Sequence, residues 1–325
     1  SGTGRWLGAN TYSGVSTLNL GAGKMWEVDT LANYGSASTL GTGSSVSNAS
    51  ALVFTGTADS GLSYLGSASV STDRLFTLNS PTAGTGGSFV GSNASNNATV
   101  VFANTGALAF GSNANSIAQI VGLGGTSTGG TLTYQPVIAG AASSVQLSGA
   151  SLILSGSNTY GGGTSLAGGT LIIPSGAAAA NFAFASGSSM AVSANATVQW
   201  ASGSTFDLSA APTQSFANNT GAAGSGFNLS AGTLTLDTNG NNVSFANAVG
   251  YGAGGLTKAG AGELALNGAA SIANPFTGAV TMSAGTIRLG NANALRQAAV
   301  DPAEVAGTDF EPLAERCNKE FGAFR

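Results

Sequence analysis

The stretch that decides the fold reads Gly255-Leu-Thr-Lys-Ala-Gly-Ala-Gly-Glu-Leu-Ala-Leu-Asn-Gly268, followed after an aromatic residue by Ala284-Gly-Thr-Ile-Arg-Leu289. The same order recurs at Val145-Gln-Leu-Ser-Gly-Ala-Ser-Leu-Ile-Leu-Ser-Gly156 and Gly168-Gly-Thr-Leu-Ile-Ile173. In both copies, short strand-forming stretches alternate with glycine-rich turns. The strand units follow one another at roughly 18 to 24 residues, a spacing that predicts the coils of a β-solenoid.

The remainder of residues 1–300 has the composition of an all-β body. Short β-prone segments are bounded by Gly, Asn or Ser, and no longer window shows a helical period. We expect strands at residues 52–54, 99–102, 132–134, 152–154, 171–173, 197–200 and 234–236. About fourteen coils of ~21 residues, stacked about 4.8 Å apart, would form a rod roughly 65 to 70 Å long.

These repeats resemble the passenger-associated repeat of bacterial autotransporter proteins. Its pattern reads Gly-Leu-Thr-Lys-x-Gly-x-Gly-x-Leu-x-Leu, then Asn-x-Tyr-x-Gly, then Ala-Gly-Thr-Leu. Residues 254–295 match well, whereas residues 145–176 have Val145-Gln-Leu147 in place of Leu-Thr-Lys, and residues 7–14 match only the middle part. The resemblance implies an all-β, right-handed parallel β-helix that is exported to the bacterial cell surface or beyond it.

Charged side chains are scarce. The 325 residues include nine Lys and Arg, thirteen Asp and Glu, one Cys and no His, whereas about a quarter of an ordinary globular sequence is charged. Without His, Ser-His-Asp relays and His-ligated zinc are excluded. The scattered basic residues cannot form a nucleic-acid interface, and no segment reaches the ~18 to 20 apolar residues of a spanning helix. We expect no cofactor, no nucleic-acid partner and no membrane span.

The stacking of coils accounts for this neutrality. Like charges about 5 Å apart repel by ~0.8 kcal/mol even in water, so uncharged Ser, Thr and Asn are favoured where each side chain faces its equivalent in the next coil. Apolar side chains point inward instead. We expect stacked, buried rows that include Leu154, Leu171, Leu234 and Leu266.

Few residues can carry chemistry. Glu27 and Asp29 lie two apart on an expected strand and so share a face; paired carboxylates can perform acid–base catalysis or bind calcium, but a solvated strand near an N-terminal cap is the simpler interpretation. The segment Asp237-Thr-Asn-Gly-Asn-Asn242 has one carboxylate and no bidentate Glu, which predicts a turn rather than a calcium loop. Lys258 is expected at the surface or as a cap at the edge of a coil. We predict no catalytic, cofactor-binding or metal-binding residue.

Residues 301–325 form a separate, charged tail, with nine charged residues against thirteen in residues 1–300. Asp309 at a cap position and Pro312 in the first turn predict a helix. Its apolar stripe is a self-association candidate and consists of Phe310, Leu313, Cys317 and Phe321. This stripe would cap the last coil, contact the next subunit or bind a cell-surface anchor, unless the tail is a non-native end.

The sequence therefore favours an extracellular, non-enzymatic β-solenoid with a structural or adhesive role, such as a surface spacer, fibre or matrix subunit. Expected partners are further copies, associating end to end, and a cell surface or glycan. One alternative is a polysaccharide-binding or polysaccharide-cleaving β-helix protein; cleavage would require clustered carboxylates or a basic residue in one groove. Another is an ice- or surface-binding solenoid, which needs regular Thr-x-Thr rows; the segments 131–133 and 233–235 are too sparse to support it.

Overall fold

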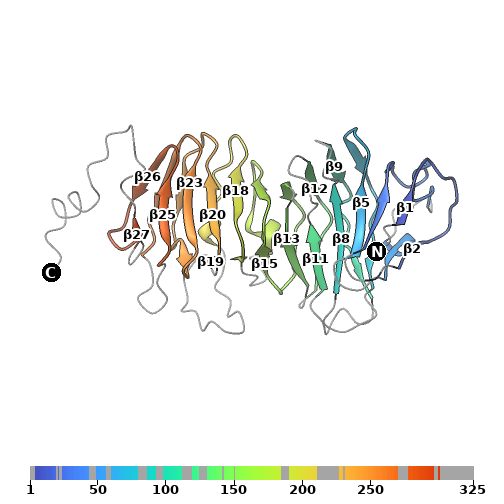
Figure 1. The fold of residues 1–325 in the computed structure, drawn as a ribbon, viewed down its shortest axis with the longest axis horizontal. Helices are drawn as coiled ribbons and strands as arrows, with labels where there is room; N and C mark the ends of the chain where they lie inside the picture. Colours follow the sequence, from blue (N-terminus) through green and yellow to red (C-terminus); the bar gives the residue numbers. More distant parts are fainter. Residues whose placement is uncertain are drawn as a thin grey trace.

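The computed structural model shows strands stacked along one long axis, with β1 and β2 near one end of the stack and β26 and β27 near the other (Figure 1). It describes residues 4–19, 21, 24–43, 49–55, 60–79, 86–92, 98–111, 119–123, 130–140, 143–149, 151–183, 190–210, 227–229, 231–269, 277–295 and 299–300. Helix within these residues is limited to three short 3-10 segments: η1 (Ala49–Ala51), η3 (Ala179–Phe182) and η5 (Leu208–Ala210).

The described strands form two long and two short sheets. Sheet 1 consists of β1 (Gly4–Trp6), β3 (Met25–Val28), β5 (Ser60–Tyr64), β8 (Gly86–Ser92), β11 (Gln119–Leu123), β13 (Ser144–Leu147), β15 (Thr164–Leu166), β17 (Met190–Val192), β19 (Phe227–Leu229) and β22 (Gly250–Tyr251). Sheet 2 consists of β6 (Val70–Thr72), β9 (Thr99–Phe102), β12 (Thr131–Tyr134), β14 (Ser151–Leu154), β16 (Thr170–Ile173), β18 (Ala196–Trp200), β20 (Thr233–Asp237), β23 (Gly255–Ala259), β25 (Ala279–Met282) and β27 (Ala299–Val300).

The two short sheets lie in the N-terminal and C-terminal parts of the stack. Sheet 3 consists of β2 (Ser16–Leu18), β4 (Leu52–Phe54), β7 (Thr77–Leu78) and β10 (Ala109–Phe110). Sheet 4 consists of β21 (Val243–Phe245), β24 (Glu263–Leu266) and β26 (Thr286–Leu289). The chain visits the sheets in turn, and neighbouring strands within each sheet are parallel: for example, β12 pairs with β14 and β14 with β16. The predicted all-β parallel β-helix is confirmed, and each of the seven expected strands lies in a strand of the structure.

The coils vary more in length than the sequence predicts. Ser151 pairs with Thr170, 19 residues further along, whereas Ala196 pairs with Leu234, 38 residues further along. Each long sheet contains ten described strands, which span about 43 Å at a spacing of ~4.8 Å. The two sheets are offset along the chain, because β1 and β3 precede the first strand of sheet 2 and β25 and β27 follow the last strand of sheet 1, so the described strands belong to twelve coils. The prediction of a uniform coil length of ~21 residues is wrong. Lengthening the chain between paired strands costs little closure entropy, so coil length can vary while the register persists.

The core consists of apolar side chains that stack from coil to coil. One inward row of sheet 2 runs through Val100, Leu132, Leu152, Leu171, Val198 and Leu236. All six side chains are buried, as are the predicted core residues Leu154, Leu234 and Leu266. Near the N-terminal half of the stack, four aromatic rings form a ladder with neighbouring centroids 5.2 to 6.0 Å apart: Phe54, Phe76, Phe102 and Tyr134. Phe and Leu side chains thus fill the interior in layers.

The described strands extend to Val300, where the sequence places the end of the solenoid. The predicted tail helix and its stripe, Phe310, Leu313, Cys317 and Phe321, lie outside the described residues. Within the described part of the chain, no helix has the length and apolar character needed to cross a membrane.

Candidate functional site

The carboxylates singled out in the sequence make structural contacts. Glu27 lies on β3, and its carboxylate forms an ion pair with the Nη2 atom of Arg5 at 2.7 Å. Asp29 accepts hydrogen bonds from the backbone N–H of Gly8 at 2.9 Å and from the Thr39 hydroxyl at 2.8 Å. Each carboxylate thus ties successive coils near the N-terminus, in line with a structural interpretation.

The segment 237–242 forms the expected turn after β20. Asp237 accepts a hydrogen bond from the backbone N–H of Asn239 at 2.9 Å and another from the Gln199 amide at 2.7 Å. Asn239 adopts a positive φ of 48°, and the Asn241 amide donates to the carbonyl of Thr238 at 2.8 Å. The oxygen atoms of Asp237 are therefore occupied by protein donors.

Lys258 lies inside the solenoid, and the expectation of a surface position is wrong. It belongs to an inward row, between Leu236 of the preceding coil and Met282 of the following coil, and its side chain is fully buried. The Nζ atom donates hydrogen bonds to the carbonyls of Ala259 and Gly260, both at 2.7 Å, and to a third carbonyl, that of Ala284, at 3.2 Å. Lys258 thus caps the carbonyls of the turn. This agrees with the alternative expectation of a cap at the edge of a coil, except that the side chain reaches the carbonyls from inside the solenoid.

The electrostatics of Lys258 follow from this position. Burial lowers the pKa of its amino group to about 8, while the negative charge of Asp237 acts in the opposite direction. The amine is accordingly mostly protonated at pH 7, and its three N–H donors match three carbonyl acceptors. A buried charge is tolerated where all its hydrogen bonds are made, so the geometry assigns Lys258 to the structure of the corner.

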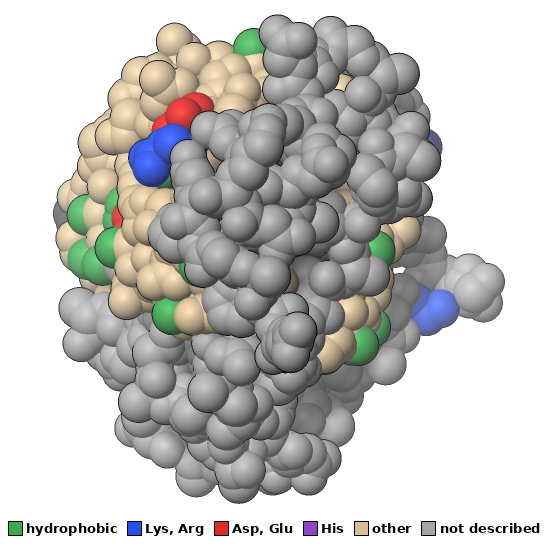
Figure 2. All heavy atoms as spheres, turned by 90° about the vertical axis from the view of Figure 1, so that its left-hand side faces the viewer, with side chains coloured by type: hydrophobic (Ala, Val, Ile, Leu, Met, Phe, Trp, Pro, Cys, Tyr) green, Lys and Arg blue, Asp and Glu red, His purple; other side chains and the backbone are tan. Residues whose placement is uncertain are grey.

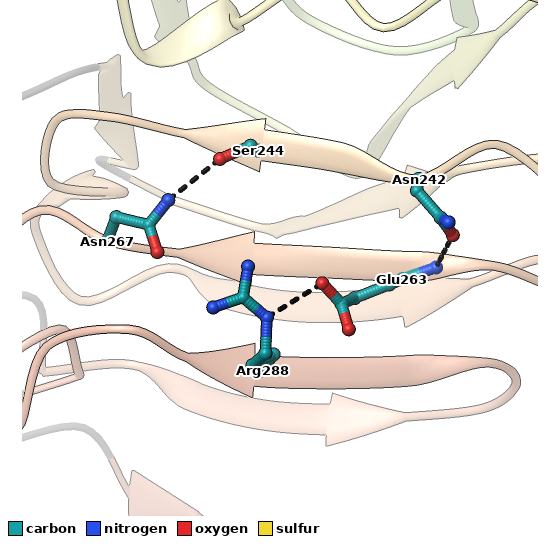
Figure 3. Close-up of polar contacts among 5 residues, drawn as sticks. All are labelled: Asn242, Ser244, Glu263, Asn267 and Arg288. Atoms are coloured by element: carbon teal, nitrogen blue, oxygen red, sulfur yellow. Dashed lines mark hydrogen bonds and ion pairs between the residues drawn. The ribbon is translucent and has the colours of Figure 1, made fainter.

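Polar side chains on the outer face of sheet 4 are also paired with one another (Figure 3). Asn242 accepts a hydrogen bond from the backbone N–H of Glu263 at 2.9 Å, and the Asn267 amide donates to the Ser244 hydroxyl at 2.7 Å. Arg288 completes the set with an ion pair to Glu263 at 2.8 Å. These contacts link three successive strands of the sheet.

The outer face of sheet 2 differs. One outward row of this sheet carries a hydroxyl in eight successive coils, and the strand register places these residues directly above one another: Thr99, Thr131, Ser151, Thr170, Thr197, Thr235, Thr257 and Thr281. We call these eight residues the hydroxyl row. Their side chains alternate with buried neighbours along each strand and are partly exposed.

Most hydroxyls of the row have no hydrogen-bond partner among the described residues. Thr257 and Thr281 share a hydrogen bond of 2.8 Å between their hydroxyls. Among the residues that the structure describes, the other six side-chain hydroxyls make no hydrogen bond to protein atoms. A row of hydroxyls that can both donate and accept is thus available to a bound molecule.

A shallow groove of about 520 Å³ runs over the middle of the row. It crosses four coils and is lined by row members Ser151, Thr170, Thr197 and Thr235, together with Gly149, Gly169, Asn195, Ala196 and Thr233. The glycines lack side chains beside the row, and the Asn195 side chain accepts a hydrogen bond from the backbone N–H of Thr233 at 2.8 Å. Among the residues that the structure describes, no charged or aromatic side chain contributes to this lining.

Charged groups are also sparse on the part of the end surface that the structure describes. Viewed from the C-terminal end, a few basic and acidic side chains interrupt a mostly neutral surface (Figure 2). In the described ranges, no three His, Cys, Asp or Glu residues are grouped so as to hold a metal ion. The groove and the hydroxyl row are therefore the candidate site. Neither was predicted from the sequence, although a Thr or Ser at the start of several predicted strands is a partial signal.

Comparison with known proteins identifies the repeats. Residues 146–173 and 256–289 match the family model described as passenger-associated-transport-repeat. Neither a curated protein nor a solved structure shows significant similarity to the chain. The two matched segments coincide with the stretches that resemble autotransporter passenger repeats, a type of repeat that indicates a secreted or cell-surface location. The chain therefore carries two passenger-associated transport repeats of the autotransporter kind within a parallel β-helix.

Proposed function

We propose that the chain is an extracellular, non-enzymatic rod that holds an adhesive face away from the surface to which it belongs. The observation that carries this proposal is the register of the two ten-stranded sheets, in which apolar rows point inward and neutral rows point outward. Parallel strands stacked in this way produce a stiff body whose length depends on the number of coils.

The contacts of the candidate chemical groups support a role without catalysis. Glu27, Asp29, Asp237 and Lys258 are each engaged in hydrogen bonds or ion pairs that join neighbouring segments. The competing function, polysaccharide cleavage, is tested by incubating the protein with pectin, other uronates and neutral glycans. We expect no turnover; turnover that is abolished by Glu27→Gln or Asp29→Asn would establish the enzyme instead.

The spacer role is tested by removing one coil. Because Ser151 pairs with Thr170, deleting residues 151–169 brings Thr170 into the place of Ser151 and preserves the in-and-out alternation of the strand. Electron microscopy should show a folded rod shortened by about 4.8 Å. A matched deletion of residues 151–160 removes half a coil and should unfold the neighbouring coils. If both deletions are tolerated equally, stacking does not set the length of the molecule.

End-to-end association remains a separate prediction that concerns residues 301–325. Deleting this tail should disassemble fibres if the stripe of Phe310, Leu313, Cys317 and Phe321 connects subunits, whereas it should start polymerisation if the stripe caps the last coil. An unchanged size distribution, measured by sedimentation, would exclude both roles.

A further inference from the structure

The groove on sheet 2 has the chemistry of a carbohydrate site. We propose that it binds one chain of a neutral polysaccharide, which lies along the solenoid axis and exchanges hydrogen bonds with the hydroxyl row. This inference rests on the proposed function, because it names the class of ligand that the adhesive face recognises.

Hydrogen-bonding capacity is the first reason. Sugar hydroxyls donate and accept, and so do Ser and Thr hydroxyls, whereas the backbone groups of a sheet are already paired. Within the groove, Ser151, Thr170, Thr197 and Thr235 make no side-chain hydrogen bond to described protein residues. By contrast, the polar side chains on sheet 4 are bonded to one another. Sheet 2 therefore carries a continuous row of hydroxyls that remain to be satisfied.

The absence of charge from the lining selects among polymers. Nucleic acids and acidic polysaccharides are recognised by Lys and Arg, and none lines this groove. The nearest carboxylate in the adjoining outward row is that of Asp237, which accepts a hydrogen bond from Gln199. A charged ligand would find no oppositely charged partner among the described residues of this groove, whereas a neutral, hydroxyl-rich ligand needs none.

Shape and spacing favour a chain over a crystalline surface. The row members recur once per coil, about 4.8 Å apart, so that the groove extends about 14 Å along the axis over four coils. A flat lattice such as ice would need a second regular row. The outward positions two residues further along carry mixed side chains instead: Val101, Thr133, Ile153, Ile172, Gln199 and Asp237. A concave surface with a single row fits one extended polymer.

The test measures binding of defined hexasaccharides by titration calorimetry. Glucan, mannan and galactan hexasaccharides represent neutral chains, and hexagalacturonate represents an acidic one. We expect saturable binding of at least one neutral hexasaccharide and at least tenfold weaker binding to the double variant Thr170→Val, Thr197→Val. Valine keeps the β-branched shape and removes only the hydroxyl. The matched control, Thr257→Val with Thr281→Val, alters the pair whose hydroxyls are bonded to each other outside the groove and should bind as the unmodified protein does.

Several outcomes would overturn the proposal: no binding of any neutral hexasaccharide, preference for hexagalacturonate, or equal binding by the unmodified protein and the groove variant. A loss of the same size in the control pair would also count against it, as would a groove variant that changes only the self-association of the protein in sedimentation. Failure here leaves the proposed function standing if electron microscopy still shows rods that shorten by one coil. Loss of those rods would refute the proposed function independently.

Discussion

The two repeat segments, residues 146–173 and 256–289, share one sequence pattern but occupy different corners of the solenoid. In the first, the chain passes from sheet 1 to sheet 2 twice, through β13 and β14 and then β15 and β16. In the second, it passes from sheet 2 to sheet 4 twice, through β23 and β24 and then β25 and β26. The repeat therefore encodes a corner and the coil stacked on it, rather than a particular face.

The corners differ in how their turns are stabilised. The turn of the first repeat runs from Leu147 to Leu152, and the equivalent turn of the second repeat runs from Lys258 to Leu264. The turn of the second repeat is therefore one residue longer. Leu147 is buried among apolar neighbours, whereas Lys258 directs its amine at three carbonyls of its own turn and the next. A longer turn that leaves carbonyls facing inward is compatible with burial when a cation satisfies them.

The largest difference between the corners should appear when a charge is placed in the closing strand. Leu171→Asp introduces a carboxylate into a fully buried inward row, which should destabilise the fold by roughly 4 kcal/mol or more. The equivalent Ile287 on β26 is only partly buried, so Ile287→Asp should cost far less. Denaturant unfolding checks both. An unfolding midpoint of Leu171→Asp equal to that of the unmodified protein would show that this register is wrong.

A smaller effect is expected from adding one methyl group to the second corner. Gly285 has a φ of 76°, and a Cβ there would lie 2.4 Å from the Gly262 carbonyl oxygen and 2.7 Å from the Lys258 Nζ atom. Gly285→Ala should therefore destabilise the protein by more than about 2 kcal/mol, measured by thermal unfolding.

The control for this substitution is Gly240→Ala. Gly240 has a similar φ of 83°, but no atom lies within 4 Å of the Cβ position. It should lose only about 1 to 2 kcal/mol through backbone strain. Equal losses at Gly240 and Gly285 would mean that close packing against Lys258 contributes nothing.

The sequence predicted the strands and the core but not the stacking. Period-two alternation and glycine turns identify strands and inward positions locally. Which residue lies above which depends on coil length, which varies from 19 to 38 residues between paired strands. The shared Gly-Thr-Leu pattern makes Thr170 correspond to Thr233 at the start of β20, yet in the structure the row continues from Thr170 through Thr197 to Thr235. A shift of two residues preserves the face, so no local pattern reveals it.

The same reasoning explains why neither the buried position of Lys258 nor the hydroxyl row was predicted. Alternation along β23 places Lys258 inward, but lysine is rarely buried, and that general preference led to the wrong expectation. The hydroxyl row is a property of eight coils at once, so it becomes visible only when the register is known. The groove further depends on glycines beside the row, which the sequence could assign only to turns.

Replacing the buried cation should have an intermediate effect. Lys258→Met keeps most of the side-chain volume but removes the donor shared by Ala259, Gly260 and Ala284, and unsatisfied buried carbonyls cost roughly 1 to 3 kcal/mol. Leu147→Met at the first corner is the matched control and should cost less than about 1.5 kcal/mol. Chemical denaturation measures both. A Lys258→Met protein at least as stable as the unmodified one would refute the capping role.

The pH dependence of unfolding sharpens the role of the same residue. The folded-state pKa of Lys258 is lowered to about 8, below its ordinary value of 10.5. Between these values the unfolded chain binds more protons than the folded one, so the contribution of Lys258 makes the fold more stable as pH rises from 8 to 10.5 and less stable as pH falls from 10.5 to 8. Unfolding free energies should therefore rise from pH 8 to 10.5 relative to Lys258→Met. A flat or falling difference would contradict the lowered pKa.

The smallest effect is expected at the outer face of the second corner, where Arg288 and Glu263 form an ion pair at 2.8 Å. Both side chains are substantially exposed, at 52% and 34%, so solvent and salt screen their attraction. Arg288→Gln should change the free energy of unfolding by at most about 0.5 kcal/mol, and the change should vanish in 0.5 to 1 M salt, which reduces the Debye length to roughly 3 to 4 Å. The first corner has the apolar Ile172 at the equivalent outward position, and Ile172→Gln should show no salt dependence. A large loss for Arg288→Gln that persists in salt would mean that the outer polar contacts, rather than the buried rows, hold the second corner together.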